Sequence, residues 1–360
     1  MGIEKVDKNL AVSEKIDAKD VVFYDVRKKP FKIYGLYKPE TEKVFKRLPD
    51  TVAKETSEGV EILYTNTAGA RVRFKTNSEY IAISAKQGDT ICLMSHMAFC
   101  GSTGFDMYSK KNGKYTHEFT YMPWTGVEGG IKVRDNKGFD GIYHFGSSEM
   151  RDITINFPLY NNVEDLYIGV SENAEILEGD EYFCDKPALC YGSSITQGGC
   201  ASRPGNAYSN ILSRMFDIDF YNLGFSGSAR GEEAMAHFIA DMDMKLFVYD
   251  YDHNAPSVEH LEATHEKFFK IIRSKNPDLP VIMITRPQFY KDENREMRKE
   301  VVYTTYKNAL NNGDKNVYFI DGSKFFDECG DGATVDKCHP NDLGFHYMAL
   351  GIAEVMKEIL

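Results

Sequence analysis

The segment PALCYGSSITQGGC, residues 187–200, joins an apolar run to a turn that contains Gly192, Ser193 and Ser194. An apolar run without alternation is typical of a strand buried on both faces of a parallel sheet. Glycine and serine commonly close strands, so one interpretation of the turn is purely structural. The other interpretation is a nucleophile held at the corner between a strand and a helix. Residues at the ends of the other strands distinguish the two.

Four further apolar runs follow, and segments with helical spacing separate them. The runs are DFYNLG (219–224), KLFVYDYD (245–252), PVIMITRP (280–287) and NVYFIDG (316–322). One helical segment begins at Val258, continues through Leu261, Phe268 and Ile272, and is ended by Pro277. Strands that alternate with helices predict a parallel sheet with right-handed crossovers.

The first half of the chain has a different pattern, with short alternating strands such as ARVRFKT (70–76) and DITINF (152–157). Asn112-Gly113 lies between two alternating runs and predicts a tight hairpin. No long helical period occurs there. Because 360 residues exceed the usual size of one core, we predict two domains. They are an all-β sandwich at residues 1–182 and an α/β domain at residues 183–360.

Ligands of an open parallel sheet bind beyond the carboxyl ends of its strands. Ser194 follows the first strand, Gly227 the second and Asn254 the third, and DKCHPNDLG, with Asp336 and His339, comes after the fifth. A serine is a poor nucleophile until a base removes its proton, which His339 could do while Asp336 holds its other ring nitrogen. The backbone N–H groups of Ser194 and Gly227 and the Asn254 amide could stabilise an oxyanion. These parts predict acyl transfer.

The four blocks resemble those of the SGNH (GDSL-type) hydrolases. YGSSIT is similar to the first block, with Ser193 in place of the usual Asp, and the resemblance makes Ser194 the nucleophile. NLGFSG is similar to the second block and DKCHP to the last, whereas DYDHN has Asp252 where Gly is usual. GFDMY (104–108) is similar to the G-x-D-L-Y signature of a β-domain that precedes certain bacterial SGNH esterases, with Met107 in place of Leu.

The resemblance implies a three-layer α/β/α domain with a flavodoxin-like parallel sheet, preceded by a jelly-roll-like sandwich. It also implies a serine esterase that hydrolyses small acyl esters, acetyl above all, on carbohydrates. Two alternatives stay open: a lysophospholipase or thioesterase, and a glycan-binding protein with a degenerate hydrolase domain. Some relatives orient the histidine with a backbone carbonyl, so Asp336 is the less secure member of the set.

Composition restricts the partners. A formal net charge of −11 disfavours nucleic acid and anionic membranes, which leaves a small-molecule or oligosaccharide ester as the expected partner. Seven cysteines without paired spacing, and no apolar leader segment, favour a cytoplasmic protein, although a removed signal peptide is an alternative. The oligomeric state is left open, and no cofactor is expected.

Several other residues have a structural and a functional interpretation. His253 lies near Asp250 and Asp252, but the spacing matches no standard ligand set, so no metal is expected. His96, His117 and His144 are interpreted as ordinary residues of the β-domain. Tyr121 and Trp124 could stack on sugar rings, but core packing is favoured. Asn254 could instead cap a helix, and Ser193 is interpreted as a turn residue.

Overall fold

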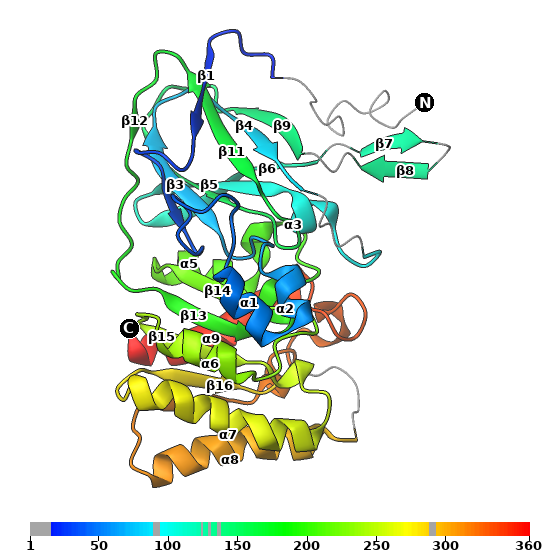
Figure 1. The fold of residues 1–360 in the computed structure, drawn as a ribbon. Coiled ribbons are helices and arrows are strands. Elements are labelled where there is room, and N and C mark those ends of the chain that lie inside the picture. The colour runs from blue at the N-terminus through cyan, green and yellow to red at the C-terminus, as the bar shows by residue number, and fades with distance from the viewer. Residues whose placement is uncertain (1–15, 89–93, 124, 129–130, 135–137, 288–292) are drawn as a thin grey trace.

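The computed structural model describes residues 16–88, 94–123, 125–128, 131–134, 138–287 and 293–360 (Figure 1). Antiparallel sheets occupy the upper part of the view, and a parallel sheet with its helices occupies the lower part. The strands before residue 180 are β1 Val21–Asp25, β2 Lys32–Tyr34, β3 Arg71–Thr76, β4 Tyr80–Lys86, β5 Phe105–Lys111, β6 Lys114–Tyr121, β7 Thr125–Glu128, β8 Ile131–Arg134, β9 Gly138–His144, β10 Arg151–Asn156, β11 Asp165–Ser171 and β12 Ile176–Leu177.

These strands build the predicted sandwich. One sheet has the order β1-β11-β4-β9, and the other has the order β12-β3-β10-β5-β6 with β2 paired to β3. Side chains of both sheets form one core, for example Ile83 and Ile168 from the first sheet and Phe74 and Ile155 from the second. The predicted hairpin joins β5 to β6 through Asn112-Gly113, both of which have positive φ.

Three short helices in this half were not predicted: α1 Asp50–Thr56, α2 Glu58–Leu63 and α3 Phe99–Thr103. Each has seven residues or fewer, too few to show a helical period in the sequence. Ala53 of α1 and Val60 of α2 are fully buried in the core of the parallel-sheet half. The first half of the chain therefore supplies part of the second core, and the boundary at residue 182 stays a prediction.

The second half contains the five predicted parallel strands, in the order β14-β13-β15-β16-β17. The order is that of flavodoxin-like sheets, and the predicted fold class is confirmed. Its elements are β13 Ala188–Gly192, α4 Ser194–Gln197, α5 Tyr208–Phe216, β14 Phe220–Gly224, α6 Glu233–Ala240, β15 Leu246–Asp250, α7 Val258–Lys275, β16 Val281–Ile284, α8 Arg295–Asn311, β17 Val317–Ile320 and α9 Asp342–Ile359.

Helices cover both faces of this sheet. Side chains alternate along β13, so that Leu189 and Tyr191 enter a core shared with α6, α7 and α8. Ala188 and Cys190 point the other way, into a core shared with α5 and α9. Because both faces are buried, the strands carry apolar residues on both faces, as the sequence pattern predicted, with buried polar exceptions at Asn222 and Asp250.

Buried polar contacts join the two halves. Arg71 of β3 forms an ion pair with Asp219, and Arg47 donates 2.6 Å to the carbonyl of Gly224 at the end of β14. Asp106, inside the GFDMY signature, accepts hydrogen bonds from Arg203 (2.8 Å) and the Gly205 N–H (2.9 Å), which follow the nucleophile turn. The signature thus attaches β5 to the segment beside the predicted site.

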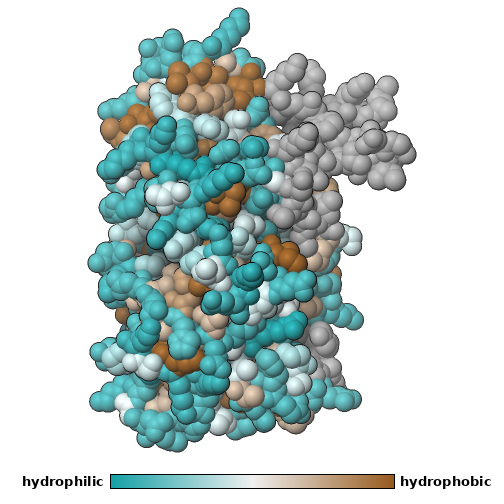
Figure 2. All heavy atoms as spheres, in the orientation of Figure 1, coloured by the Kyte–Doolittle hydropathy of each residue, from teal (hydrophilic) through white to brown (hydrophobic). Residues whose placement is uncertain are grey.

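The surface is mainly hydrophilic in Figure 2, with an apolar area at the top of the view over β1. β1 is an edge strand, and Val22 and Phe23 are each 38% exposed there. Within the described part of the chain, no helix is both long and apolar enough to cross a membrane. Six of the seven cysteines are described, and all six are free thiols.

Candidate active site

Ser194 lies at a sharp corner between β13 and α4. The side chain of Ser193 accepts a hydrogen bond from the Ile195 N–H (3.1 Å) and caps α4, which confirms its interpretation as a turn residue. A Cβ on Gly192 would lie 2.1 Å from Thr196 Oγ1, so only glycine lets the helix begin so close to the strand. Ser194 is consequently the first residue of α4 and is 5% exposed.

Ser194, His339 and Asp336 form a hydrogen-bonded row. Ser194 Oγ lies 3.0 Å from His339 Nε2, and His339 Nδ1 lies 2.8 Å from Asp336 Oδ2. The other oxygen of Asp336 accepts the backbone N–H groups of Cys338 (3.0 Å) and His339 (2.7 Å). The turn before α9 therefore holds the carboxylate and the imidazole in a fixed mutual orientation.

The same hydrogen bonds stabilise the charge on Asp336. Partial burial by itself raises the pKa of this carboxyl, but donation from the backbone and ring of His339 and from the Cys338 N–H outweighs it and lowers the pKa to about 2. Asp336 thus stays ionised at any pH where an esterase would work. An ionised carboxylate on Nδ1 directs the lone pair of neutral His339 to Nε2, toward Ser194.

Gly227 and Asn254 are tied to the elements around the row. The Asn254 side chain donates to the Phe225 carbonyl (2.9 Å), and the Ser226 N–H donates to Gln197 Oε1 of α4 (2.9 Å). Gly227 has φ +65, and among the described residues beyond its two chain neighbours no atom lies within 4 Å of a Cβ built there. The alternative role of Asn254 as a helix cap is wrong, because Ser257 caps α7.

Residues of the first half form hydrogen bonds with α4, the helix that carries Ser194, and the sequence analysis did not identify them. The Tyr160 hydroxyl donates to the Ser194 carbonyl (3.1 Å). Buried Gln197 donates to the Leu159 carbonyl (3.1 Å) and to Asn66 Oδ1 (3.3 Å). No motif marks Asn66 or Tyr160, since their only link to Ser194 is tertiary packing.

His96 is a second residue that sequence reasoning missed. It was interpreted as an ordinary surface or core residue, and the structure places its ring centroid 5.2 Å from that of His339. His117 and His144, by contrast, are exposed on β6 and β9. Tyr121 is 1% exposed and donates to the Ile81 carbonyl (3.0 Å), so it packs in the core, whereas Trp124 lies outside the described residues.

Asp250, Asp252 and His253 have separate partners. Asp250 accepts from Thr196 (3.0 Å), Asp252 accepts from the Arg286 N–H (3.0 Å), and His253 Nε2 lies 3.1 Å from Cys338 Sγ. Burial lowers the pKa of His253 to about 4, so this ring is neutral near pH 7. The three residues thus connect the third block to Thr196 of the first block, to Arg286 after β16 and to Cys338 of the last block.

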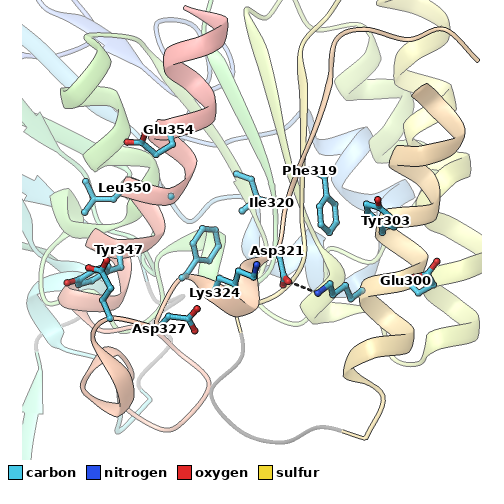
Figure 3. Close-up of a pocket in the computed structure, with 14 residues that line it drawn as sticks. Glu300, Tyr303, Phe319, Ile320, Asp321, Lys324, Asp327, Tyr347, Leu350 and Glu354 are labelled. Carbon is cyan, nitrogen blue, oxygen red and sulfur yellow. Dashed lines mark hydrogen bonds and ion pairs between the residues drawn. The ribbon is translucent and has the colours of Figure 1, made fainter. Parts of the chain in front are cut away.

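A large cavity lies elsewhere, at the edge of the parallel sheet (Figure 3). It has a volume of about 970 Å³ and lies between α8, β17 and α9. Phe319, Ile320 and Tyr303 line it, and a dashed line marks the ion pair between Lys299 and Asp321 (2.5 Å). No predicted site residue lines this cavity.

Comparisons with known proteins agree with this geometry. A model of the GDSL-like lipase/acylhydrolase family matches residues 185–357, and a model of the GxDLY N-terminus of SGNH-hydrolase-type esterases matches residues 21–176. A Bacteroides ovatus protein with the provisional name GDSL-like lipase is similar in structure, with 28% identity and a TM-score of 0.80 over 94% of this chain and 98% of its own.

Two more distant structures share the fold alone. One is the salicylyl-acyltransferase of a tetracycline biosynthetic pathway, with 16% identity and a TM-score of 0.73 over 95% of this chain and 98% of its own. The other is a family two carbohydrate esterase from Cellvibrio japonicus, with 10% identity and a TM-score of 0.62 over 94% of this chain and 98% of its own. No curated protein matches the sequence. The two family matches, one on each half, show that the chain belongs to the GDSL-like lipase/acylhydrolase family, as a two-domain acyl ester hydrolase of the SGNH type.

Proposed function

We propose that this chain is a serine esterase that removes small acyl groups, acetyl above all, from hydroxyl groups of carbohydrates. The observation that carries the proposal is the hydrogen-bonded row of Ser194, His339 and Asp336, with spacings of 3.0 and 2.8 Å. It is the arrangement that serine acyl transfer requires: a nucleophile, a base and a group that orients the base.

In the proposed mechanism, Ser194 Oγ attacks the ester carbonyl while His339 Nε2 takes the hydroxyl proton. The negative oxygen of the tetrahedral intermediate accepts hydrogen bonds from the Ser194 and Gly227 N–H groups and from the Asn254 amide. His339 then gives its proton to the leaving sugar oxygen, and an acyl-enzyme remains on Ser194. Water, activated by the same histidine, hydrolyses it and restores the serine.

The preference for a short acyl group rests on the residues around the nucleophile. The segments CASRPGNAYSN (200–210) and GFSGSARGE (224–232) contain no run of large apolar side chains, and their largest apolar members, Tyr208 and Phe225, are fully buried. Among the described residues, nothing lies within 4 Å of a Cβ built on Gly227. Burying an alkyl chain contributes about 0.8 kcal/mol per CH₂, and this gain needs apolar walls. Polar loops instead suit a sugar, and the fold shared with a family two carbohydrate esterase supports that choice of alcohol.

The test compares acyl lengths and alcohols. We expect the purified chain to hydrolyse p-nitrophenyl acetate faster than the butyrate and octanoate esters, and to release acetate from acetylated xylan, mannan or simple acetylated sugars. Ser194→Ala is the control for background hydrolysis. Faster turnover of octanoate than of acetate would favour the lysophospholipase or thioesterase alternative. No turnover of any ester, together with sugar binding, would favour the glycan-binding alternative.

A further inference from the structure

Three side chains with metal-binding atoms converge at the catalytic row. The ligand atoms of His96, Cys200 and His339 all lie within 4.8 Å of one another. They come from three distant segments: the stretch before α3, the turn after α4 and the turn before α9. Neither the family matches nor the proposed mechanism uses His96 or Cys200.

Packing fixes the positions of His96 and Cys200. Met97, next to His96, is buried, and its Cε would lie 3.2 Å from a Cβ on Gly199. A Cβ on Gly101 of α3 would lie 2.0 Å from the Ala201 carbonyl oxygen. The segment that carries His96 and the one that carries Cys200 are therefore in direct contact on both sides of the cluster.

The donor set matches the chemistry of zinc. One thiolate and two imidazoles are ligands that Zn²⁺ prefers, and three protein ligands leave a fourth position for water. His339 already donates its Nδ1–H to Asp336 over 2.8 Å, and zinc-binding histidines usually have such a carboxylate partner. The pairing that orients a catalytic base therefore also presents Nε2 as a metal ligand.

We propose that Zn²⁺ binds reversibly to His96, Cys200 and His339 Nε2 and thereby inhibits the enzyme. Coordination uses the Nε2 lone pair that would otherwise accept the Ser194 proton, so the base is lost while the metal is bound. The Cys200 thiol releases its proton to solvent as the Zn–S bond forms. Ligand atoms of a tetrahedral zinc site lie about 3.3–3.8 Å apart, so the separations of at most 4.8 Å need to shorten by no more than about 1.5 Å on binding.

Burial opposes deprotonation of the Cys200 thiol when no metal is present. It raises the pKa of the Cys200 thiol to about 12, with smaller contributions from Asp336 and Cys338. The thiol is therefore protonated without metal, and the ion has to displace the proton, as Zn²⁺ does at cysteine ligands. Inhibition rests on the proposed role of His339, whereas metal binding does not.

The first experiment measures binding without activity. Co²⁺ is titrated into full-length Ser194→Ala, and we expect a thiolate-to-cobalt charge-transfer band in the near ultraviolet. The band should disappear when Cys200→Ser is added and persist with Cys329→Ser, a free thiol outside the cluster. Loss of the band with Cys338→Ser but not with Cys200→Ser would assign the metal to the neighbouring set of Asp336, Cys338 and His339, and would overturn the proposal.

The second experiment measures inhibition. Zn²⁺ should inhibit hydrolysis of p-nitrophenyl acetate, and EDTA should restore it. Measured against each variant's own metal-free rate, His96→Ala should raise the Zn²⁺ concentration for half-inhibition by at least about tenfold. Exposed His144→Ala should leave that concentration unchanged. If Zn²⁺ inhibits His96→Ala and the native chain at the same concentration, the proposed metal site is refuted. If the native chain shows the cobalt band but hydrolyses no ester, only the proposed function is refuted.

Discussion

Two regions differ in what they offer a ligand: the hydrogen-bonded row of Ser194, His339 and Asp336, and the cavity beside β17. The row begins with Ser194 at the carboxyl end of the interior strand β13 and connects a hydroxyl, an imidazole and a carboxylate in series. The cavity, of about 970 Å³, lies beside an edge strand, where no further strand of the sheet packs on that side. Its Lys299 and Asp321 are paired with each other.

The comparison shows that a large cavity and a set of reactive side chains need not lie in the same place. A large cavity with an apolar lining is a usual first hypothesis for a ligand site. Here the space beside β17 follows from the end of the sheet, whereas the row follows from the topology that brings the first, second, third and last blocks to one edge. The following predictions test whether the two regions are as separate as their positions suggest.

The largest effect is expected from the nucleophile. Ser194→Ala should lower kcat for p-nitrophenyl acetate by at least about 10³-fold, because no other group forms the acyl-enzyme. Ser193→Ala is the matched control. It should keep most of the turnover and lose about 1 kcal/mol of stability, since it caps α4. Equal loss of activity in both variants would mean that the nucleophile is misassigned.

A smaller effect is expected from the oxyanion donor. Asn254→Ala should lower kcat by about 10²-fold with little change in KM, because its amide matters most when the carbonyl oxygen becomes negative. The variant also releases the Phe225 carbonyl, so melting temperatures are measured in parallel. A rise in KM at constant kcat would assign Asn254 to substrate binding instead.

Asp250, which accepts a hydrogen bond from Thr196 of α4, should affect the stability of the fold rather than the rate of ester hydrolysis. Burial raises the pKa of Asp250 to about 8 from an ordinary 3.8, against an opposing hydrogen bond from Thr196. The folded state then holds a proton that the unfolded chain releases, so this contribution to stability is full below about pH 4 and is lost as the pH rises toward 8.

Asp250→Asn removes the titrating group. The free energy of unfolding in urea should therefore fall less between about pH 4 and 8 in this variant than in the native chain. Contributions from other titrating groups cancel in the difference. Exposed Asp331→Asn serves as the control. Identical pH slopes in Asp250→Asn and the native chain would show that Asp250 is ionised when folded.

The smallest effect is expected at the cavity. Leu350→Ser changes a partly exposed cavity residue of α9, and kcat/KM for acetyl esters should stay within about twofold. Leu177→Ser, equally exposed on β12, is the control. A loss that grows with acyl length in Leu350→Ser alone would connect the cavity to the site and favour the lipid-ester alternative.

Much of this molecule could be predicted from local patterns. Unalternating apolar runs predicted the five buried strands, and the Asn112-Gly113 hairpin followed from turn chemistry. The proximity of Asp336 and His339 was predictable because the two lie within one turn of chain. Strand alternation did not predict that Arg71 and Arg73 are buried, because their burial depends on tertiary contacts: Arg71 bonds to Phe220 of the second half, and Arg73 lies against the Tyr182 ring.

The sequence by itself determined the fold class, the order of the blocks and the pairing of Asp336 with His339, because each depends on periodicity or on residues a few positions apart. Ser194 meets His339 across 145 positions, and that contact follows from the topology of the parallel sheet. Tertiary structure alone decided which residues of the first half reach the site. Tyr160 contacts the Ser194 carbonyl, Leu159 contacts Gln197 of α4, and His96 meets His339, across separations of more than 30 residues that leave no periodic signal. Such contacts depend on how the sandwich packs against the parallel-sheet half, and packing is a property of the assembled surfaces rather than of any segment.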